Sequence, residues 1–179
     1  MITFNTSQLS KGIHFPNMKG VVETKQISFL KRLWRFFSFS RKFEIVENYF
    51  LWVDILQKFI FLPKTFIYNG ASVPKLLGMF YSTTGVLFLG SGPHDFSYRY
   101  NGLFLIDPNT GKLEFQEMSK KEQDSLFNHL CQLETGMGLA TGIARHSLMI
   151  FGIPAWINCR KRNCLVIRDF PEFYEDTYV

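Results

Sequence analysis

The sequence predicts an α+β fold in a single domain, in which a small N-terminal strand region packs on about three helices. Residues 44–68 are rich in Ile, Val, Phe, Tyr and Trp, which favour strands, and Asp54 and Pro63 divide this stretch into two or three strands. Helix signals follow near residue 94 and after Ser119. At 179 residues, 46% of them hydrophobic, the chain is long enough for one core of this kind.

The first 43 residues are predicted to form a basic, aromatic extension or further strands. Eight of them are Lys or Arg, whereas Glu23 is the only acid. If the stretch 29–43 is helical, its apolar residues form one stripe beside basic residues, which is typical of a helix that lies on a membrane. The same stripe also fits a segment that packs on its own domain, so both interpretations stay open.

The core domain is predicted to span residues 44–155 and to carry the motifs N-G-A-S-V-P and H-D-F-S-Y-R. Residues 75–90 are expected to be buried and either helical or irregular. A helix is then expected to begin with Ser91 as its cap and Pro93 in its first turn. This start would place Asp95 near the helix N-terminus, where a negative charge is favoured and stays ionised.

A hairpin and a second helix are expected next. The run Asp107–Gly111 has the composition of a hairpin loop and lies between two apolar stretches. Ser119 and Glu122 match a capping box, which predicts that a helix begins here. Gly136 is expected to end that helix, because glycine adopts the left-handed conformation common just past a helix.

The end of the chain is predicted to hold one more helix and a tail. The helix is expected over residues 139–151, because Gly152 and Pro154 disfavour its continuation. Residues 156–179 alternate blocks of basic and acidic residues and are predicted to be a charged C-terminal tail. The sequence shows no secretion signal. The charge-free stretch 76–93 contains four glycines and a proline, which suit a packed loop better than a spanning helix, and the apolar stretch 147–159 is too short to cross a bilayer, so a soluble or peripheral protein is expected.

His94 and its neighbours form the main candidate site. On a helix, His94 and Tyr98 share one face, while Asp95 and Arg99 share the next. A hydrolase that activates water needs a base with a pKa near neutral, a carboxylate that orients this base, and positive charge near the oxyanion. His94 could be the base and Asp124 the orienting carboxylate, with Asp95 as ligand of a hard cation such as calcium. Alternatively, His94 packs or caps while Asp95 and Arg99 form a surface pair.

Two other patterns suggest different chemistry. Ser72 lies in a glycine-containing turn and could be a nucleophile with His94 as its base, although a nucleophile elbow has glycine where Pro74 stands. Cys159 and Cys164 flank a basic turn, but one cysteine pair does not supply four zinc ligands. The three cysteines of the chain are too few for a disulfide scaffold of this size, which indicates a reducing compartment. No zinc finger or phosphate-binding glycine loop supports nucleic-acid binding.

Taken in order, these motifs resemble the domain-of-unknown-function family 1353, which is widespread in tailed bacteriophages and prophages. The family pattern is a strand ending in V-P-x-G-F, then D-G-A-S-x-P, an H-D-x-x-Y-R helix and an A-D-x-x-F helix. The matching residues here are Phe61–Pro74, His94–Arg99 and the helix of Asp124, within residues 45–155. Asn69 stands where the pattern has Asp, and Gln123 stands where it has Ala.

The H-D-x-x-Y helix followed by a distant aspartate is also similar to the core of the phospholipase A2 enzymes. That similarity implies that His94 is a general base, that Asp95 binds calcium, and that Tyr98 and Asp124 brace the imidazole. The calcium-loop glycine and cysteine signature of those enzymes is missing from this sequence. The candidate residues are therefore His94, Asp124 and Tyr98 for catalysis, Asp95, Asn69 and Gly70 for a metal, and Ser72 and Arg99 besides.

These resemblances together imply a bacteriophage protein that is a calcium-assisted hydrolase of lipid esters. The alternative is a non-catalytic virion or host-interaction protein, in which the same polar residues form a network that fixes the fold. The partners implied are an anionic membrane surface or other virion proteins. The implied location is the virion or the host cytoplasm, with membrane contact at the periphery.

Overall fold

Nine strands and four α-helices make up the part of the chain that the computed structural model describes, namely residues 3–11, 15–21, 38–39, 42–69, 73–74, 88–136 and 138–160. The strands are β1 (Met18–Val21), β2 (Ser38–Phe39), β3 (Lys42–Ile45), β4 (Tyr49–Val53), β5 (Lys58–Leu62), β6 (Ile67–Asn69), β7 (Val73–Pro74), β8 (Gly102–Ile106) and β9 (Leu113–Glu117). The helices are α3 (Phe88–Tyr100), α4 (Lys120–Thr135), α5 (Gly138–Phe151) and α6 (Ile153–Arg160), besides the short 3-10 helix η1 (Thr6–Gln8). The α+β prediction is confirmed.

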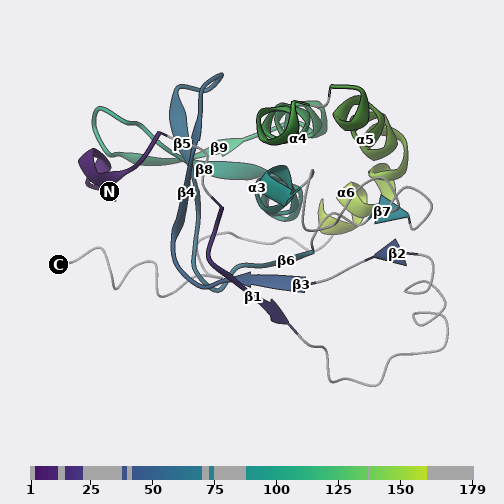
Figure 1. Cartoon of the computed structure of the whole chain (residues 1–179), viewed down its shortest axis with the longest axis horizontal. Coiled ribbons are helices and arrows are strands. Elements are labelled where there is room, and N and C mark those ends of the chain that lie inside the picture. The colour runs from purple at the N-terminus through teal and green to yellow at the C-terminus, as the bar shows by residue number, and fades with distance from the viewer. Residues whose placement is uncertain are drawn as a thin grey trace.

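The strands form three antiparallel sheets, and the helices lie together on one side of the largest (Figure 1). The strand orders are β4-β5-β8-β9, β1-β3-β6 and β2-β7. Asp54 begins the turn between β4 and β5, and Pro63 follows the last residue of β5, so both predicted breaks are confirmed. The predicted hairpin loop is confirmed between β8 and β9, where the Gly111 amide donates to the Asp107 carbonyl over 2.9 Å.

Aromatic side chains fix α3 against the sheets. Phe96 is fully buried, and its ring lies 5.0 Å from that of Phe66, beside β6, and 5.9 Å from that of Phe104 on β8. On the outer side of the helix, the Arg99 guanidinium donates to the Ile67 carbonyl over 2.9 Å and stacks on the Phe66 ring. These contacts set both the rotation and the depth of α3, and therefore the direction in which its polar residues point.

The predicted start of this helix was wrong. α3 begins at Phe88, so Ser91 is not its cap and Pro93 lies inside it. The group that caps α3 belongs to another helix and therefore leaves no signal in the local sequence. The Glu134 carboxylate of α4 accepts a hydrogen bond from the Leu89 amide over 2.9 Å. Asp95 consequently lies in the middle of the helix and not near its N-terminus.

The boundaries of the next helices agree with the sequence signals. The Ser119 and Glu122 capping box is present, and Gly136 ends α4 with a φ of 65°. The helix expected over residues 139–151 is α5, and it does end before Gly152. The sequence did not predict α6, which starts directly afterwards. Pro154 is tolerated there because the first turn of a helix needs no amide hydrogen.

The structure also bears on the predicted N-terminal helix and on the predicted segment boundaries. In the stretch 29–43, residues 38–39 and 42–43 belong to strands, so the helical interpretation is wrong for them, and the rest lies outside the described residues. β3 crosses the boundary expected at residue 43, and α6 crosses the one expected at residue 156. No helix in the described ranges has the length and apolar character needed to cross a bilayer.

Thr65 adopts a backbone conformation that β-branched residues disfavour, with a φ of 68°. We expect Thr65→Gly to raise the free energy of unfolding by about 1 kcal/mol, because relief of the strain exceeds the greater flexibility of glycine in the unfolded chain. Urea denaturation measures this change. Asn101→Gly is the matched control, since Asn101 has a φ of 67° but asparagine tolerates this region. Equal gains at both positions would contradict the strain at Thr65.

Candidate functional site

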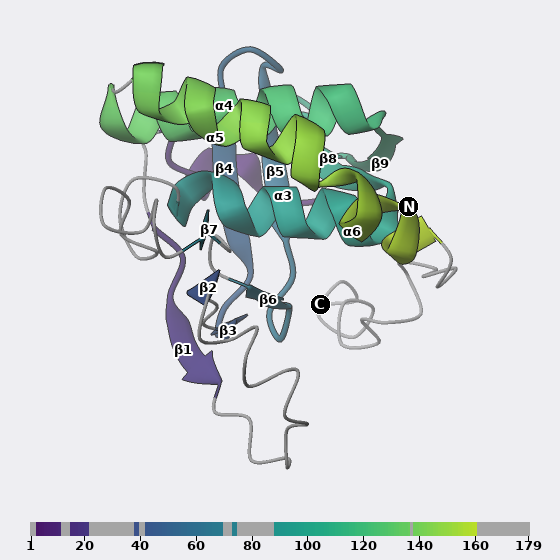
Figure 2. The same cartoon turned by 90° about the vertical axis from the view of Figure 1, so that its right-hand side faces the viewer.

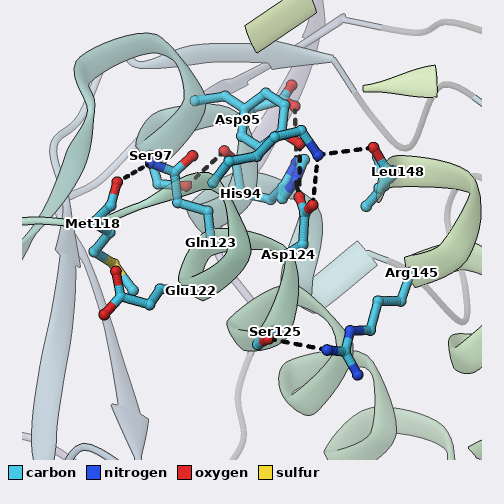
Figure 3. Close-up of polar contacts among 12 residues, drawn as sticks. His94, Asp95, Ser97, Met118, Glu122, Gln123, Asp124, Ser125, Arg145 and Leu148 are labelled. Atoms are coloured by element: carbon cyan, nitrogen blue, oxygen red, sulfur yellow. Dashed lines mark hydrogen bonds and ion pairs between the residues drawn. The ribbon is translucent and has the colours of Figure 1, made fainter. Parts of the chain in front are cut away.

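A buried cluster at the contact of α3 and α4 contains the predicted site residues His94, Tyr98 and Asp124. The Asp124 carboxylate lies between the helices and is only 1% exposed. Its Oδ1 lies 3.3 Å from His94 Nε2 and accepts a hydrogen bond from the Tyr98 hydroxyl over 2.6 Å. The imidazole and the phenol ring lie 4.1 Å apart, as their spacing along one helix face predicts. Figure 3 shows His94 and Asp124 pointing toward one another from the two helices.

Lys120 completes this cluster and was not among the predicted site residues. Its ammonium donates to Asp124 Oδ2 over 2.6 Å and to the Leu148 carbonyl of α5 over 3.0 Å. The spacing of four residues between Lys120 and Asp124 on one helix was the available signal. Lys120 is also the first residue of α4, where the helix dipole disfavours positive charge, so the buried carboxylate is what favours a lysine there.

The charges around Asp124 keep it ionised. Burial alone raises the pKa of Asp124, but the hydrogen bonds from His94, Lys120 and Tyr98 outweigh burial and hold that pKa below its ordinary value. The same carboxylate stabilises the neutral phenol of Tyr98, because burial first and then the hydrogen bond to Asp124 raise the pKa of Tyr98 well above its usual range. Asp124 is therefore the acceptor in all three contacts.

His94 has one nitrogen committed and one that can titrate. Since Asp124 is ionised, Nε2 carries the hydrogen that it shares with the carboxylate, and protons are gained and lost at Nδ1. Nδ1 lies 4.0 Å from Asp95, whose side chain is 29% exposed. Burial lowers the pKa of His94, but hydrogen bonding to Asp124 and Asp95 and their negative charges outweigh it, and the pKa lies above its ordinary value of 6.5.

The junction of α5 and α6 covers this cluster. The Leu148 carbonyl receives the Lys120 ammonium, and Gly152 lies against the Tyr98 hydroxyl so closely that an added Cβ would be 2.9 Å from it. His94 and Tyr98 are 7% and 6% exposed. The partly exposed Asp95 therefore marks the side on which the cluster is nearest to solvent.

The remaining predicted residues lie elsewhere or outside the description. Arg99 points to β6 and Phe66. Asn69 ends β6, whereas Gly70 and Ser72 lie outside the described residues, so neither the calcium turn nor the serine nucleophile is placed. Within the described ranges, no group of three or more His, Cys, Asp or Glu side chains is arranged to hold a metal ion.

A second His–Asp pair provides a comparison. His129 Nε2 on α4 lies 2.7 Å from the Asp54 carboxylate in the turn between β4 and β5. The hydrogen bond from His129 lowers the pKa of Asp54. The Asp54 side chain is 54% exposed, so this pair is a surface contact of the ordinary kind. Substitutions at this exposed pair are therefore the matched controls for substitutions at the buried pair.

Comparison of the chain with protein-family models, with curated protein sequences and with solved structures gives no match. The function must therefore be inferred from the cluster itself and from the motifs in the sequence.

The two pKa shifts predict how stability depends on pH. The raised pKa of His94 contributes stability that is complete below the unfolded value of about 6.5 and is lost as the pH rises through the folded pKa. The lowered pKa of Asp124 contributes stability that is complete above the unfolded value of about 4 and is lost as the pH falls through the folded pKa. Both contributions are complete between about pH 4 and 6.5.

We therefore expect the stability lost by His94→Gln to be largest at about pH 5.5 and to shrink as the pH rises above about 6.5. Urea denaturation of both proteins across this range measures the difference. His129→Gln is the control, because its pair is exposed. If wild type and His94→Gln lose stability in parallel with rising pH, the pKa of His94 is not raised by folding.

Proposed function

We propose that this chain is a hydrolase in which His94 is the general base and Asp124 and Tyr98 orient it. One observation carries the proposal: the buried Asp124 carboxylate occupies His94 Nε2, while Nδ1 is directed toward the partly exposed Asp95. An imidazole whose Nε2–H is held by a carboxylate, with Nδ1 as the titrating nitrogen on the side nearest to solvent, is the arrangement that removes a proton from water.

The chemistry proposed is ester hydrolysis. His94 Nδ1 takes a proton from water, the hydroxide oxygen forms a bond to the ester carbonyl carbon, and the bond to the alcohol oxygen then breaks. The proton on Nδ1 passes to the departing alcohol, so His94 returns to its neutral form. Asp124 stabilises the imidazolium between these steps without taking the proton itself. Asp95, Asn69 and Gly70 are the residues that would hold a calcium ion, and the ion would supply positive charge for the oxyanion.

The substrate class and the origin are narrower proposals that rest on the resemblances. We propose a lipid ester as the substrate, from the similarity to the phospholipase A2 core, and membership of the phage family, from the ordered motifs between Phe61 and Asp124. The location in the virion or host cytoplasm belongs to the same proposal. So does contact of the basic N-terminal residues with an anionic membrane.

A second candidate function is a non-catalytic structural or host-interaction role. It is favoured by how completely Asp124 is enclosed, with the three donors His94, Tyr98 and Lys120 around it and almost no exposure. A buried network of this kind fixes the arrangement of packed helices by itself. On this alternative, the cluster joins α3, α4 and α5 and performs no chemistry.

Calcium titration calorimetry, combined with fatty-acid release from mixed anionic vesicles, decides between the two. Under the hydrolase proposal, wild type binds calcium and releases fatty acid, Asp95→Asn loses both, and His94→Ala loses only the release. His129→Ala is the matched control and keeps both. If wild type neither binds calcium nor releases fatty acid, while His94→Ala and Asp95→Asn mainly lower thermal stability, the structural role is the correct one.

A further inference from the structure

The outermost helices carry exposed apolar side chains at regular spacing. Met149 on α5 and Ile153 and Ile157 on α6 are 44%, 45% and 44% exposed. They follow one another at intervals of four residues, the repeat of one helix face. The helical hydrogen bonds from Gly152 to Leu148 and from Trp156 to Gly152 run through the junction, so this repeat continues from α5 into α6. We call these three side chains the α5–α6 stripe.

The stripe belongs to the helices that lie outermost on this side of the domain. Figure 2 shows α5 and α6 on the viewer's side of α3 and α4, with the four-stranded sheet behind them. α5 contacts α4 by polar groups on its inner side, through the Leu148 carbonyl to Lys120 and through Arg145 to Ser125. Apolar side chains that lie in a row on an outer helix face are typical of a surface that binds a partner or a membrane.

Charge indicates which partner the stripe fits. From Gly136 to Arg168 the sequence contains no Asp or Glu. Arg145 donates to Ser125 on the inner side of α5, and the other charged residues of this stretch are all basic and follow the stripe in the sequence, namely Arg160, Lys161, Arg162 and Arg168. A basic, acid-free segment with apolar side chains on one face matches an anionic lipid surface, which takes up the apolar groups and attracts the cations. A second copy of the chain would instead bring two basic segments together, which is unfavourable.

The same two helices also cover the candidate site. Leu148 precedes Met149 and receives Lys120, and Gly152 precedes Ile153 and lies against the Tyr98 hydroxyl. The stripe is therefore the outer side of the junction that closes the His94 cluster. A lipid surface in contact with the stripe would lie beside the cluster rather than on a remote face.

We propose that the α5–α6 stripe is a docking surface for anionic lipid, with Met149, Ile153 and Ile157 entering the boundary between headgroups and acyl chains. The docking surface itself goes beyond the proposed function. A role of this surface in bringing a lipid ester to the His94 cluster would rest on that function. The basic N-terminal residues were the only membrane contact expected from the sequence. The stripe is a separate contact at the other end of the chain.

Vesicle co-sedimentation of the full chain, without calcium, tests this proposal. The vesicles are phosphatidylcholine with about 30% phosphatidylserine, and pure phosphatidylcholine serves for comparison. We expect wild type to bind the anionic vesicles more tightly than the neutral ones, and Ile153→Asn with Ile157→Asn to weaken that binding at least about tenfold. Ile55→Asn is the matched control, because Ile55 is 58% exposed in the turn between β4 and β5, and it should bind as wild type does.

Three results would overturn the docking surface. The first is that wild type binds neither kind of vesicle, and the second is that the double variant binds as wild type does. The third is that wild type is a dimer in sedimentation equilibrium whereas the double variant is a monomer, because the stripe would then bind a second copy. Circular dichroism must show that the double variant is folded, and Met149→Gln, on α5, provides a second variant should it not be. Because binding is measured without turnover, loss of hydrolysis with binding intact would contradict only the proposed function.

Discussion

Asp124→Asn should lower the free energy of unfolding by about 3 kcal/mol. The substitution keeps the shape of the side chain and removes its charge. It leaves the Lys120 ammonium, only 18% exposed, without its counter-ion, and it leaves an amide nitrogen where the carboxylate accepted a hydrogen bond. Breaking a buried pair by removing one partner is strongly destabilising for this reason. Urea denaturation at pH 6 measures the loss, and NMR titration of the His94 ring should show its pKa falling, because burial remains while the negative charge of Asp124 is gone.

The double variant Lys120→Met with Asp124→Asn separates charge pairing from packing. We expect it to be less destabilised than the sum of the two single variants, because neither charge remains without its partner. The surface control is Asp54→Asn, which removes the partner of His129 and should cost much less, since that pair is solvated. Additive losses at Lys120 and Asp124 would mean that the two side chains do not interact as their 2.6 Å distance indicates.

The parts of this fold that depend on neighbouring residues in the sequence could be predicted from it. The capping box at Ser119, the left-handed Gly136 and the loop at Asp107–Gly111 are local hydrogen-bonding and backbone patterns, and each lies where the sequence places it. The shared face of His94 and Tyr98 likewise follows from helical spacing. The strands between residues 44 and 68 follow from composition and from the two breaks at Asp54 and Pro63.

The parts of the fold that depend on contacts between residues distant in the sequence could not be predicted from it. α3 begins earlier than Ser91 because Glu134, on another helix, accepts the Leu89 amide hydrogen, and no local rule shows this. In the sequence, Lys120 resembles any solvated lysine at a helix start. Only the fold brings the Leu148 carbonyl and the Asp124 carboxylate within hydrogen-bond distance of its ammonium. Thr65 is a further case: no local pattern marks this threonine as left-handed, and its φ of 68° is visible only in the structure.

Gly90→Val is expected to lower the free energy of unfolding by about 3 kcal/mol, because it forces apart the two helices that carry the candidate site. Gly90 lies inside α3, where replacing glycine normally stabilises a helix. Here an added Cβ would lie 2.8 Å from Cys131 Sγ and 3.0 Å from the Phe127 carbonyl oxygen of α4. The carbonyl belongs to the backbone of α4 and cannot rotate away, so the overlap must be relieved by moving α3. Urea denaturation measures the loss.

The matched control is Gly142→Ala in α5, where nothing lies within 4 Å of an added Cβ. There the usual helix preference applies, and we expect a gain of about 1 kcal/mol. Cys131→Ala should restore only part of the stability lost by Gly90→Val, since it removes the sulfur but leaves the Phe127 carbonyl in place. Because the same displacement separates His94 from Asp124, the His94 pKa of Gly90→Val should fall as well. A valine variant with wild-type stability and an unchanged His94 pKa would mean that the close approach of α3 and α4 at Gly90 does not position the cluster.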